Sequence, residues 1–212
     1  MTKLQLALDT ASTAEDLRVA QAAGSSVDII EAGTVLVLND GLGAVRELRK
    51  RFPDHPLVAD IRIGRAGSKF ATMAFEAGAD IVTVLGECPI DVVEGAARAA
   101  EKFSGKVEVE LPPNWDQNDL DVWADAGVAT IIAHRSGRFE AADDDEIRGV
   151  LRRLADSDLH GMSVTLAGGF SVGDTQYYEE LPYDIVAVGS AIAKASDPAG
   201  AAASLRDELT RK

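Results

Sequence analysis

Cysteine is almost absent from this 212-residue chain, and basic residues are scarce relative to acidic ones. The single cysteine, Cys88, cannot form a disulfide within the chain, so a disulfide-stabilised domain is excluded and a reducing, cytoplasmic setting is expected. Against 35 Asp and Glu there are only 21 Lys and Arg, which gives a formal net charge of −14. Nucleic acids and anionic membranes require a basic face, so neither is an expected partner. A small anionic molecule is still possible, because a few local arginines can bind one.

Long hydrophobic runs are missing as well. No apolar run approaches the roughly 18 residues of a membrane-spanning helix. Residues 1–4 lead directly into a strand-like pattern, without the basic and apolar regions of a signal peptide, so no secretion signal is expected. Linkers and low-complexity segments are also absent, and we expect residues 1–212 to form a single domain that buries a sizeable core.

The chain does contain a regular alternation of short apolar segments and amphipathic helical segments, repeated at roughly 25 residues. The predicted strands cover residues 3–8, 28–31, 57–60, 80–85, 106–110, 128–133, 163–166 and 185–188. The predicted helices cover about 13–23, 41–51, 68–77, 90–103, 119–126, a segment opened by the acidic residues 143–146, a short segment at 175–181, and 197–210. Eight strands alternating with helices predict an α/β fold of the (β/α)8 TIM-barrel type. An open doubly wound sheet is the alternative, but residues 9–12 are not the glycine-rich turn that it favours.

Polar residues stand where the predicted strands end. In a β/α barrel these ends meet at one rim, which carries the active site. After the apolar segment Leu57-Val58-Ala59, charged residues alternate with apolar ones, so Asp60 and Arg62 are expected to point the same way into the barrel mouth. The whole set of strand-end residues is Asp9, Glu31, Asp60, Arg62, Glu110, His134, Gly168, Gly169, Gly189 and Ser190.

The carboxylates of this set would repel one another and raise each other's pKa unless a cation neutralised them. Arg62 is one candidate cation and a divalent metal is another. Glu31 and Asp60, on neighbouring strands, suit Mg²⁺, which takes one or two carboxylates together with waters and substrate oxygens. For any single carboxylate, a helix cap or a structural ion pair is the alternative. His134 is a candidate proton donor or acceptor near neutral pH, or else a residue that bonds a neighbouring loop.

Glycines follow the last two predicted strands, at Gly168-Gly169 and at Gly189. Loops at these places in a barrel often bind phosphate through backbone N–H groups. Glycine lets a phosphate approach the backbone closely. The pattern therefore predicts a phosphate-bearing substrate.

Together these residues resemble a known family. The matching segments are residues 4–9, 27–34, 59–60, 82–84, 107–111, 134–136, 167–169 and 195–198. The chain resembles the 3-keto-L-gulonate 6-phosphate decarboxylases and hexulose-6-phosphate synthases of the orotidine monophosphate decarboxylase superfamily. Glu110 and the segment His134-Arg135-Ser136 are more similar to the decarboxylases.

The resemblance implies a homodimer with active sites at the interface and a reaction that passes through a cis-enediolate. It implies that Glu31 and Asp60 hold Mg²⁺, that Asp9 and Glu110 contact substrate or metal waters, and that His134 delivers a proton. It also implies a substrate- and phosphate-binding set made of Ala167, Gly168, Gly169, Gly189, Ser190, Arg135 and Arg138.

The chain departs from the family motif Asp-x-Lys-x-x-Asp on the third strand. Arg62 replaces the lysine; it can stabilise an enediolate electrostatically but does not easily transfer a proton. Arg65 replaces the last aspartate, which in the family reaches into the partner's site. Ser190 replaces an arginine that follows the glycine of the last strand, and Arg138 lies next to the position of a further family arginine. Compared with the family, this chain thus has fewer cationic side chains at the phosphate end of the site and more at the metal end.

From these observations we expect a Mg²⁺-dependent carbon–carbon lyase, with decarboxylation of a sugar phosphate such as 3-keto-L-gulonate 6-phosphate as the leading reaction. The alternatives are aldol addition of the synthase type, epimerisation of a pentulose phosphate, and a non-catalytic sugar-phosphate-binding relative. The carboxylate cluster argues against the last, because a simple scaffold has no reason to keep mutually repelling charges.

Overall fold

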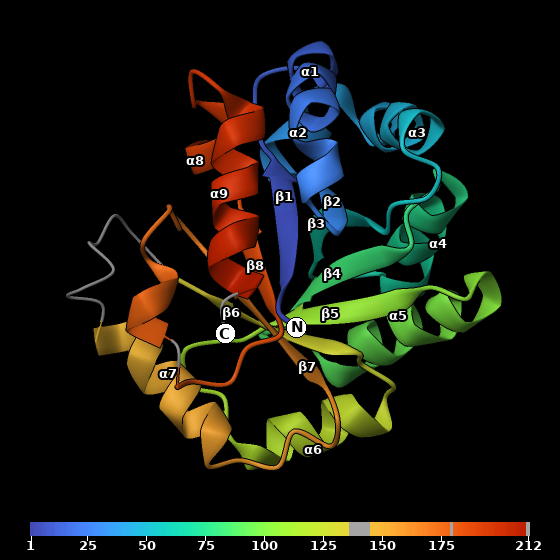
Figure 1. Ribbon diagram of the computed structural model, residues 1–212. Coiled ribbons are helices and arrows are strands. Elements are labelled where there is room, and N and C mark those ends of the chain that lie inside the picture. The colour runs from blue at the N-terminus through green and yellow to red at the C-terminus, as the bar shows by residue number, and fades with distance from the viewer. Residues whose placement is uncertain (136–144, 179, 211–212) are drawn as a thin grey trace.

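A computed structural model describes residues 1–135, 145–178 and 180–210, which form a closed parallel barrel surrounded by helices (Figure 1). The order of strands around the barrel is their order in the sequence, and β1 pairs with β8 to close the ring. The strands are β1 (Lys3–Leu8), β2 (Ile29–Ala32), β3 (Leu57–Ile63), β4 (Ile81–Leu85), β5 (Lys106–Glu110), β6 (Thr130–His134), β7 (Ser163–Ala167) and β8 (Ile185–Val188). The predicted (β/α)8 TIM barrel is confirmed.

The helices lie outside the ring of strands, and the last helix, α9, packs against the first, α1. The α-helices are α1 (Thr13–Ala23), α2 (Thr34–Asp40), α3 (Leu42–Arg51), α4 (Gly67–Glu76), α5 (Ile90–Phe103), α6 (Gln117–Asp125), α7 (Asp145–Ala155), α8 (Ser190–Ala193) and α9 (Pro198–Thr210), and the short 3-10 helices are η1 (Gly24–Ser26) and η3 (Thr175–Tyr178).

Most predicted elements are confirmed to within two residues, with three corrections. The sequence predicted one helix after the second strand, but the structure has two, because α2 precedes α3. The short α8 was also missed. Strand β3 continues three residues past Asp60 to Ile63, because its end still pairs with β4.

An Asp-Ile pair recurs at the start of β2, β4 and β8, as Asp28-Ile29, Asp80-Ile81 and Asp184-Ile185. Each carboxylate accepts a backbone N–H from the start of the preceding strand. The three donors are Leu4, Leu57 and Val164, at 2.8, 2.7 and 2.9 Å. These N–H groups lie near the amino-terminal ends of their strands, and the carboxylates supply them with hydrogen-bond acceptors.

The barrel interior has an apolar floor and a polar upper layer. The floor is a separate cluster of four buried side chains, Ile29, Val58, Ile81 and Ile185. Because side chains alternate along a strand, residues two positions further on face the same interior. These include Glu31, Asp60 and Thr83, which lie above the floor and line a cavity. The fold therefore closes the barrel from below and leaves its polar layer open at the carboxyl ends of the strands.

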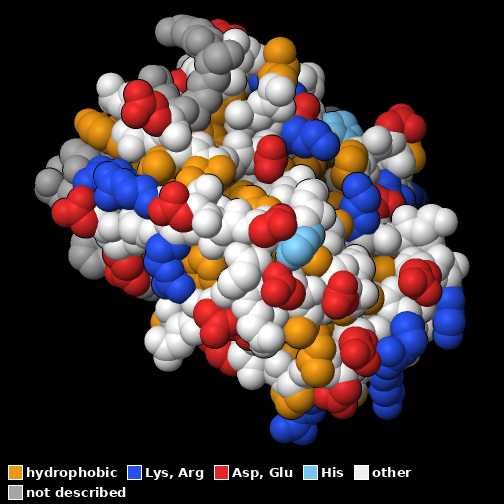
Figure 2. Space-filling view, turned by 90° about the horizontal axis from the view of Figure 1, so that it is seen from below, with side chains coloured by type: hydrophobic (Ala, Val, Ile, Leu, Met, Phe, Trp, Pro, Cys, Tyr) orange, Lys and Arg blue, Asp and Glu red, His pale blue; other side chains and the backbone are white. Residues whose placement is uncertain are grey.

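One face of the molecule carries charges of both signs. Figure 2 shows one face on which acidic and basic side chains are interspersed with small apolar areas. Within the described residues, no helix has the length and apolar composition needed to cross a bilayer.

Candidate active site

A cavity of about 380 Å³ opens at the carboxyl ends of the strands. Its size lies within the usual range for small-molecule sites. It is lined by most of the predicted residues: Asp9, Glu31, Asp60, Arg62, Glu110, His134, Arg135, Ala167, Gly168, Gly169, Gly189 and Ser190. Arg65 is exposed and does not line the cavity of its own barrel, and Arg138 lies outside the described residues.

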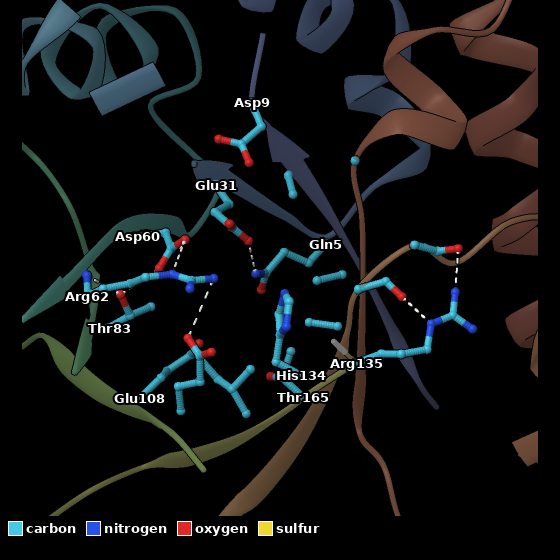
Figure 3. Close-up of a pocket in the computed structure, with 18 of the residues that line it drawn as sticks. Gln5, Asp9, Glu31, Asp60, Arg62, Thr83, Glu108, His134, Arg135 and Thr165 are labelled. Carbon is cyan, nitrogen blue, oxygen red and sulfur yellow. Dashed lines mark hydrogen bonds and ion pairs between the residues drawn. The ribbon is translucent and has the colours of Figure 1, made fainter. Parts of the chain in front are cut away.

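Asp60 is held by hydroxyl groups on both of its carboxylate oxygens. Thr34, the first residue of α2, donates to Oδ2 at 2.6 Å, and Thr83 of β4 donates to Oδ1 at 2.7 Å. Figure 3 shows Asp60 and Thr83 on either side of Arg62. The two hydroxyls fix the orientation of the carboxylate without adding charge, so Asp60 remains available to a cation.

Arg62 has a left-handed backbone conformation, with a φ of 43°. Its N–H donates to the hydroxyl of Thr83 at 3.0 Å, where the pairing of β3 with β4 is irregular. Its guanidinium lies between two carboxylates, with Nε 3.5 Å from Oδ2 of Asp60 and Nη2 3.6 Å from Oε2 of Glu110. A non-glycine residue in this region of backbone space is strained, and such strain is found preferentially at functional sites. Here it aims a fixed positive charge at the centre of the cavity.

Glu31 and Glu108 are the carboxylates whose charge the barrel disfavours most. Burial, together with the charge of Asp60, raises the pKa of Glu31 to about 8, although Gln5 donates to its Oε2 at 2.5 Å. Burial and the charge of Asp60 also raise the pKa of Glu108 to about 7. The polar layer therefore holds protons at neutral pH unless an additional cation binds.

The donor set formed by Glu31 and Asp60 fits a magnesium ion. The two side chains come from neighbouring strands, repel each other, and present hard carboxylate oxygens to one cavity. Across the described ranges, no three side chains of His, Cys, Asp or Glu converge to form a metal centre by themselves. An ion here would complete its shell with waters or substrate oxygens, which is the usual behaviour of Mg²⁺.

Asp9 makes a structural contact of the helix-cap type, which is one of the alternatives for a carboxylate at a strand end. Its Oδ1 accepts the backbone N–H of Val35 at 2.8 Å, at the start of α2. This is a helix N-terminal contact formed across the barrel rim, in which negative charge is favourable. Asp9 also lines the cavity. His134 is the last residue of β6, is exposed at the cavity mouth, and points its ring toward the centre in Figure 3.

Gly168 and Gly169 form a loop with two consecutive left-handed residues, at φ 101° and 67°. Arg135 lies against this loop and is almost fully buried. Its Nε donates to the carbonyl of Gly168 at 2.7 Å and its Nη2 to the carbonyl of Gly169 at 2.6 Å. The guanidinium of Arg135 therefore bonds the protein's own backbone, which the sequence did not indicate.

The sequence did not indicate several residues of the site. Gln5, Thr83, Glu108 and Thr165 line the cavity, and Thr34 bonds Asp60. A signal was available for some of them. Gln5, Ala7 and Asp9 are spaced two residues apart, and so are Glu108 and Glu110. Gln5 and Glu108 therefore share a strand face with a predicted site residue. Thr34 carried no such signal, because its contact with Asp60 depends on how α2 is placed.

The fold and this site define a class of protein. A β/α barrel with opposed carboxylates, an arginine and a glycine loop at its carboxyl rim is typical of enzymes that act on small anionic substrates. The comparison of sequences then gives the family. Residues 2–205 match the Orotidine 5'-phosphate decarboxylase / HUMPS family, and the chain belongs to it. Enzymes of this family are carbon–carbon lyases, and the predicted resemblance is confirmed.

Individual relatives cover nearly the whole chain. The chain is 35% identical over 207 residues to 3-keto-L-gulonate-6-phosphate decarboxylase SgbH of Escherichia coli (strain K12), covering 97% of this chain and 94% of that protein. It superposes with a TM-score of 0.89 and 32% identity on the crystal structure of KGPDC from Streptococcus mutans, covering 100% of this chain and 98% of that one. The 3-hexulose-6-phosphate synthase from Salmonella typhimurium gives a TM-score of 0.89 at 31% identity, covering 99% of both chains. The chain is thus similar to sugar-phosphate decarboxylases and synthases.

Proposed function

We propose that this protein is a Mg²⁺-dependent decarboxylase of a sugar phosphate such as 3-keto-L-gulonate 6-phosphate. In this reaction the bond to the carboxylate breaks, CO₂ leaves, and the electron pair remains on the substrate as an enediolate that is then protonated. The observation that supports the proposal most directly is the Asp60–Arg62–Glu110 arrangement, which aims a cation at the cavity in a chain that is 35% identical to a decarboxylase.

Glu31 and Asp60 would hold the magnesium ion, with Thr34 and Thr83 orienting Asp60. The ion would supply positive charge to neighbouring substrate oxygens. In the metal-free protein Glu31 holds a proton, because burial raises its pKa to about 8. Binding of the ion therefore requires loss of this proton, and affinity should increase with pH.

Arg62 would stabilise the enediolate by donating hydrogen bonds to its oxygens. A guanidinium stays protonated, so Arg62 provides charge and geometry but not a proton. The proton would come from His134, whose position at the end of β6 places it at the cavity mouth. Glu110, 3.6 Å from Arg62, would keep the guanidinium from turning away, and Asp9 would contact the substrate at the opposite side of the rim.

The phosphate would bind at the loops after β7 and β8. Ala167, Gly168, Gly169, Gly189 and Ser190 line this part of the cavity. Backbone N–H groups would provide most of the contacts, since Ser190 carries no charge and Arg135 bonds loop carbonyls. Arg138 is the further candidate cation.

A homodimer is the assembly that we propose, with Arg65 contributing to the partner's site. Arg65 is exposed and does not line its own cavity. Helices α2 and α4, which both contact β3, carry exposed apolar side chains, namely Val35 and Leu38 on α2 and Phe70 and Met73 on α4. Sedimentation equilibrium gives the mass directly, and Leu38→Glu, at a residue that is 80% exposed, should shift it toward the monomer. Cytoplasmic localisation stays a prediction from the single cysteine.

The test of the proposed reaction is release of CO₂ from 3-keto-L-gulonate 6-phosphate, combined with proton exchange in D₂O. The protein is incubated with L-xylulose 5-phosphate or D-ribulose 5-phosphate, with Mg²⁺ or with EDTA, and deuterium at C1 is followed by NMR. We expect metal-dependent CO₂ release and exchange, both abolished in Asp60→Asn with the fold retained. Full activity in Asp60→Asn would refute the assignment. Absence of turnover together with ligand-induced stabilisation would support the non-catalytic alternative.

Aldol addition of the hexulose-6-phosphate synthase type is the second candidate. It is favoured by the similarity to a synthase structure over 99% of both chains. Formaldehyde consumption in the presence of D-ribulose 5-phosphate would select it. Deuterium incorporation with inversion of configuration would instead select an epimerase.

A further inference from the structure

We infer that Arg135 is a positioning residue, which shapes the loop after β7 into an anion-binding cradle without touching the ligand. This inference deepens the proposed function, because it rests on a phosphate-bearing substrate bound at the Gly168-Gly169 loop.

Arg135 fixes the direction of two peptide groups in the loop. Arg135 binds the carbonyls of Gly168 and Gly169 with two donors of one planar fork, at 2.7 and 2.6 Å. All peptide bonds of the described chain are trans, and in a trans peptide the N–H points opposite to the C=O. The N–H groups that belong to these two peptides are those of Gly169 and Phe170. Both must therefore point away from the guanidinium.

Those two N–H groups have no acceptor within the described protein, so a bound anion could accept from them. Gly168 and Gly169 themselves line the cavity. In Figure 3 the guanidinium of Arg135 points away from Asp60 and Arg62, and its bonds run to the loop. Successive backbone N–H groups in a turn can form a concave site for an anion.

The surroundings of Arg135 keep its guanidinium against this loop. Its guanidinium carbon lies 4.7 Å from the ring centre of Phe170, which packs edge-on against Tyr178. Its own backbone N–H donates to the carbonyl of Ala167 at 2.8 Å. A side chain added at Gly168 would come within 2.6 Å of the backbone oxygen of Arg135. Arg135 and the loop thus fit together closely. The positive charge of the guanidinium would lie behind the loop, on the side opposite to the proposed anion.

A lysine cannot reproduce this arrangement, because an ammonium lacks the planar fork that reaches two carbonyls at once. Removing the guanidinium leaves the left-handed turn to be ordered by the ligand itself, which reduces affinity. We expect the loss to be about 10- to 100-fold in Arg135→Met, the range typical when an orienting partner behind a ligand contact is removed. Arg135→Lys should fall between this variant and wild type.

The experiment is a titration of ¹⁵N-labelled protein with inorganic phosphate, in which the amide signals of Gly169 and Phe170 are followed by NMR. Arg153→Met is the matched control. Arg153 also donates to a backbone carbonyl, that of Trp115 at 2.5 Å, and stacks on its ring at 4.2 Å, but it lies outside the cavity. Wild type and Arg153→Met should show the same saturable shifts, and Arg135→Met should bind phosphate far more weakly.

Equal phosphate affinity in Arg135→Met and wild type overturns the inference. If Arg135→Met does not fold, wild-type affinity in Arg135→Lys overturns it. A kinetic split is the second readout: KM for the phosphorylated substrate should rise while kcat is largely kept. A fall in kcat at constant KM would mean that Arg135 acts on the adjacent His134, and would also overturn the inference. The titration needs no turnover, so it supports or refutes the cradle even where the proposed reaction fails.

Discussion

Replacing Glu31 by glutamine should stabilise the metal-free protein, and the gain should grow with pH. Burial and the charge of Asp60 raise the pKa of Glu31 from 4.5 to about 8. The unfolded chain releases this proton near the ordinary value, whereas the folded protein keeps it until the higher one. Between these two pH values the folded state binds more protons, so its stability falls as the pH rises through this window.

The size of this effect follows from the shift. One pKa unit corresponds to about 1.4 kcal/mol, so a rise from 4.5 to about 8 corresponds to about 5 kcal/mol once fully developed. Relaxation of the site and entry of water make this an upper value. For a chain of this size it corresponds to a decrease in Tm of about 10–20 °C. Glu31→Gln removes the titration and keeps an oxygen that can accept from Gln5, 2.5 Å away in the wild type.

The assay is thermal unfolding in EDTA at several pH values between about 5 and 9, for wild type, Glu31→Gln and the control Glu101→Gln, which alters an exposed carboxylate on α5. Plots of Tm against pH should be parallel for wild type and Glu101→Gln. The Tm of Glu31→Gln should rise relative to both as the pH increases. Added Mg²⁺ should stabilise wild type more than Glu31→Gln, because a ligand stabilises the state that binds it. A constant difference between wild type and Glu31→Gln at every pH would refute the reasoning.

Three further predictions concern the same barrel. Arg62→Met should lower kcat about 10²- to 10³-fold, as expected for loss of a preorganised charge, with partial recovery in Arg62→Lys, measured by steady-state kinetics; an unchanged kcat would remove Arg62 from the reaction. Thr83→Val should weaken Mg²⁺ binding about tenfold in calorimetry, because Asp60 loses an orienting hydroxyl at 2.7 Å; unchanged affinity would contradict this role. Asp28→Ala should cost about 1–3 kcal/mol of unfolding free energy in urea, because the N–H of Leu4 loses its acceptor. Although burial raises the pKa of Asp28, hydrogen bonds from Arg206 and Leu4 bring it below 3.8, so the cost should shrink as the pH falls below that value; a cost that is the same at every pH would count against this explanation.

The sequence by itself determined the fold and which residues lie at the carboxyl-terminal rim of the barrel. Apolar segments that end in polar residues placed seven of the eight strand starts to within one residue, and their alternation with helical patterns predicted the closed barrel. Because all parallel strands end at the same rim, Asp60 and Glu31 could be placed in one site without knowledge of any contact. Residues on one strand face, such as Glu108 beside Glu110, were equally accessible to this reasoning.

Only the tertiary structure decided what each rim residue contacts. The left-handed backbone of Arg62 arises from the irregular pairing of β3 with β4, and no local pattern in the sequence specifies that irregularity. The start of α2 receives the carboxylate of Asp9 from a different strand, and Thr34 reaches Asp60 only because α2 begins there. Arg135 was expected to meet the substrate, and only the structure shows that its guanidinium binds the carbonyls of Gly168 and Gly169, more than thirty residues away in the chain. Hydrophobic periodicity fixes which side of a strand is buried, whereas the partner of a polar group depends on distances between segments that meet only after the barrel has closed.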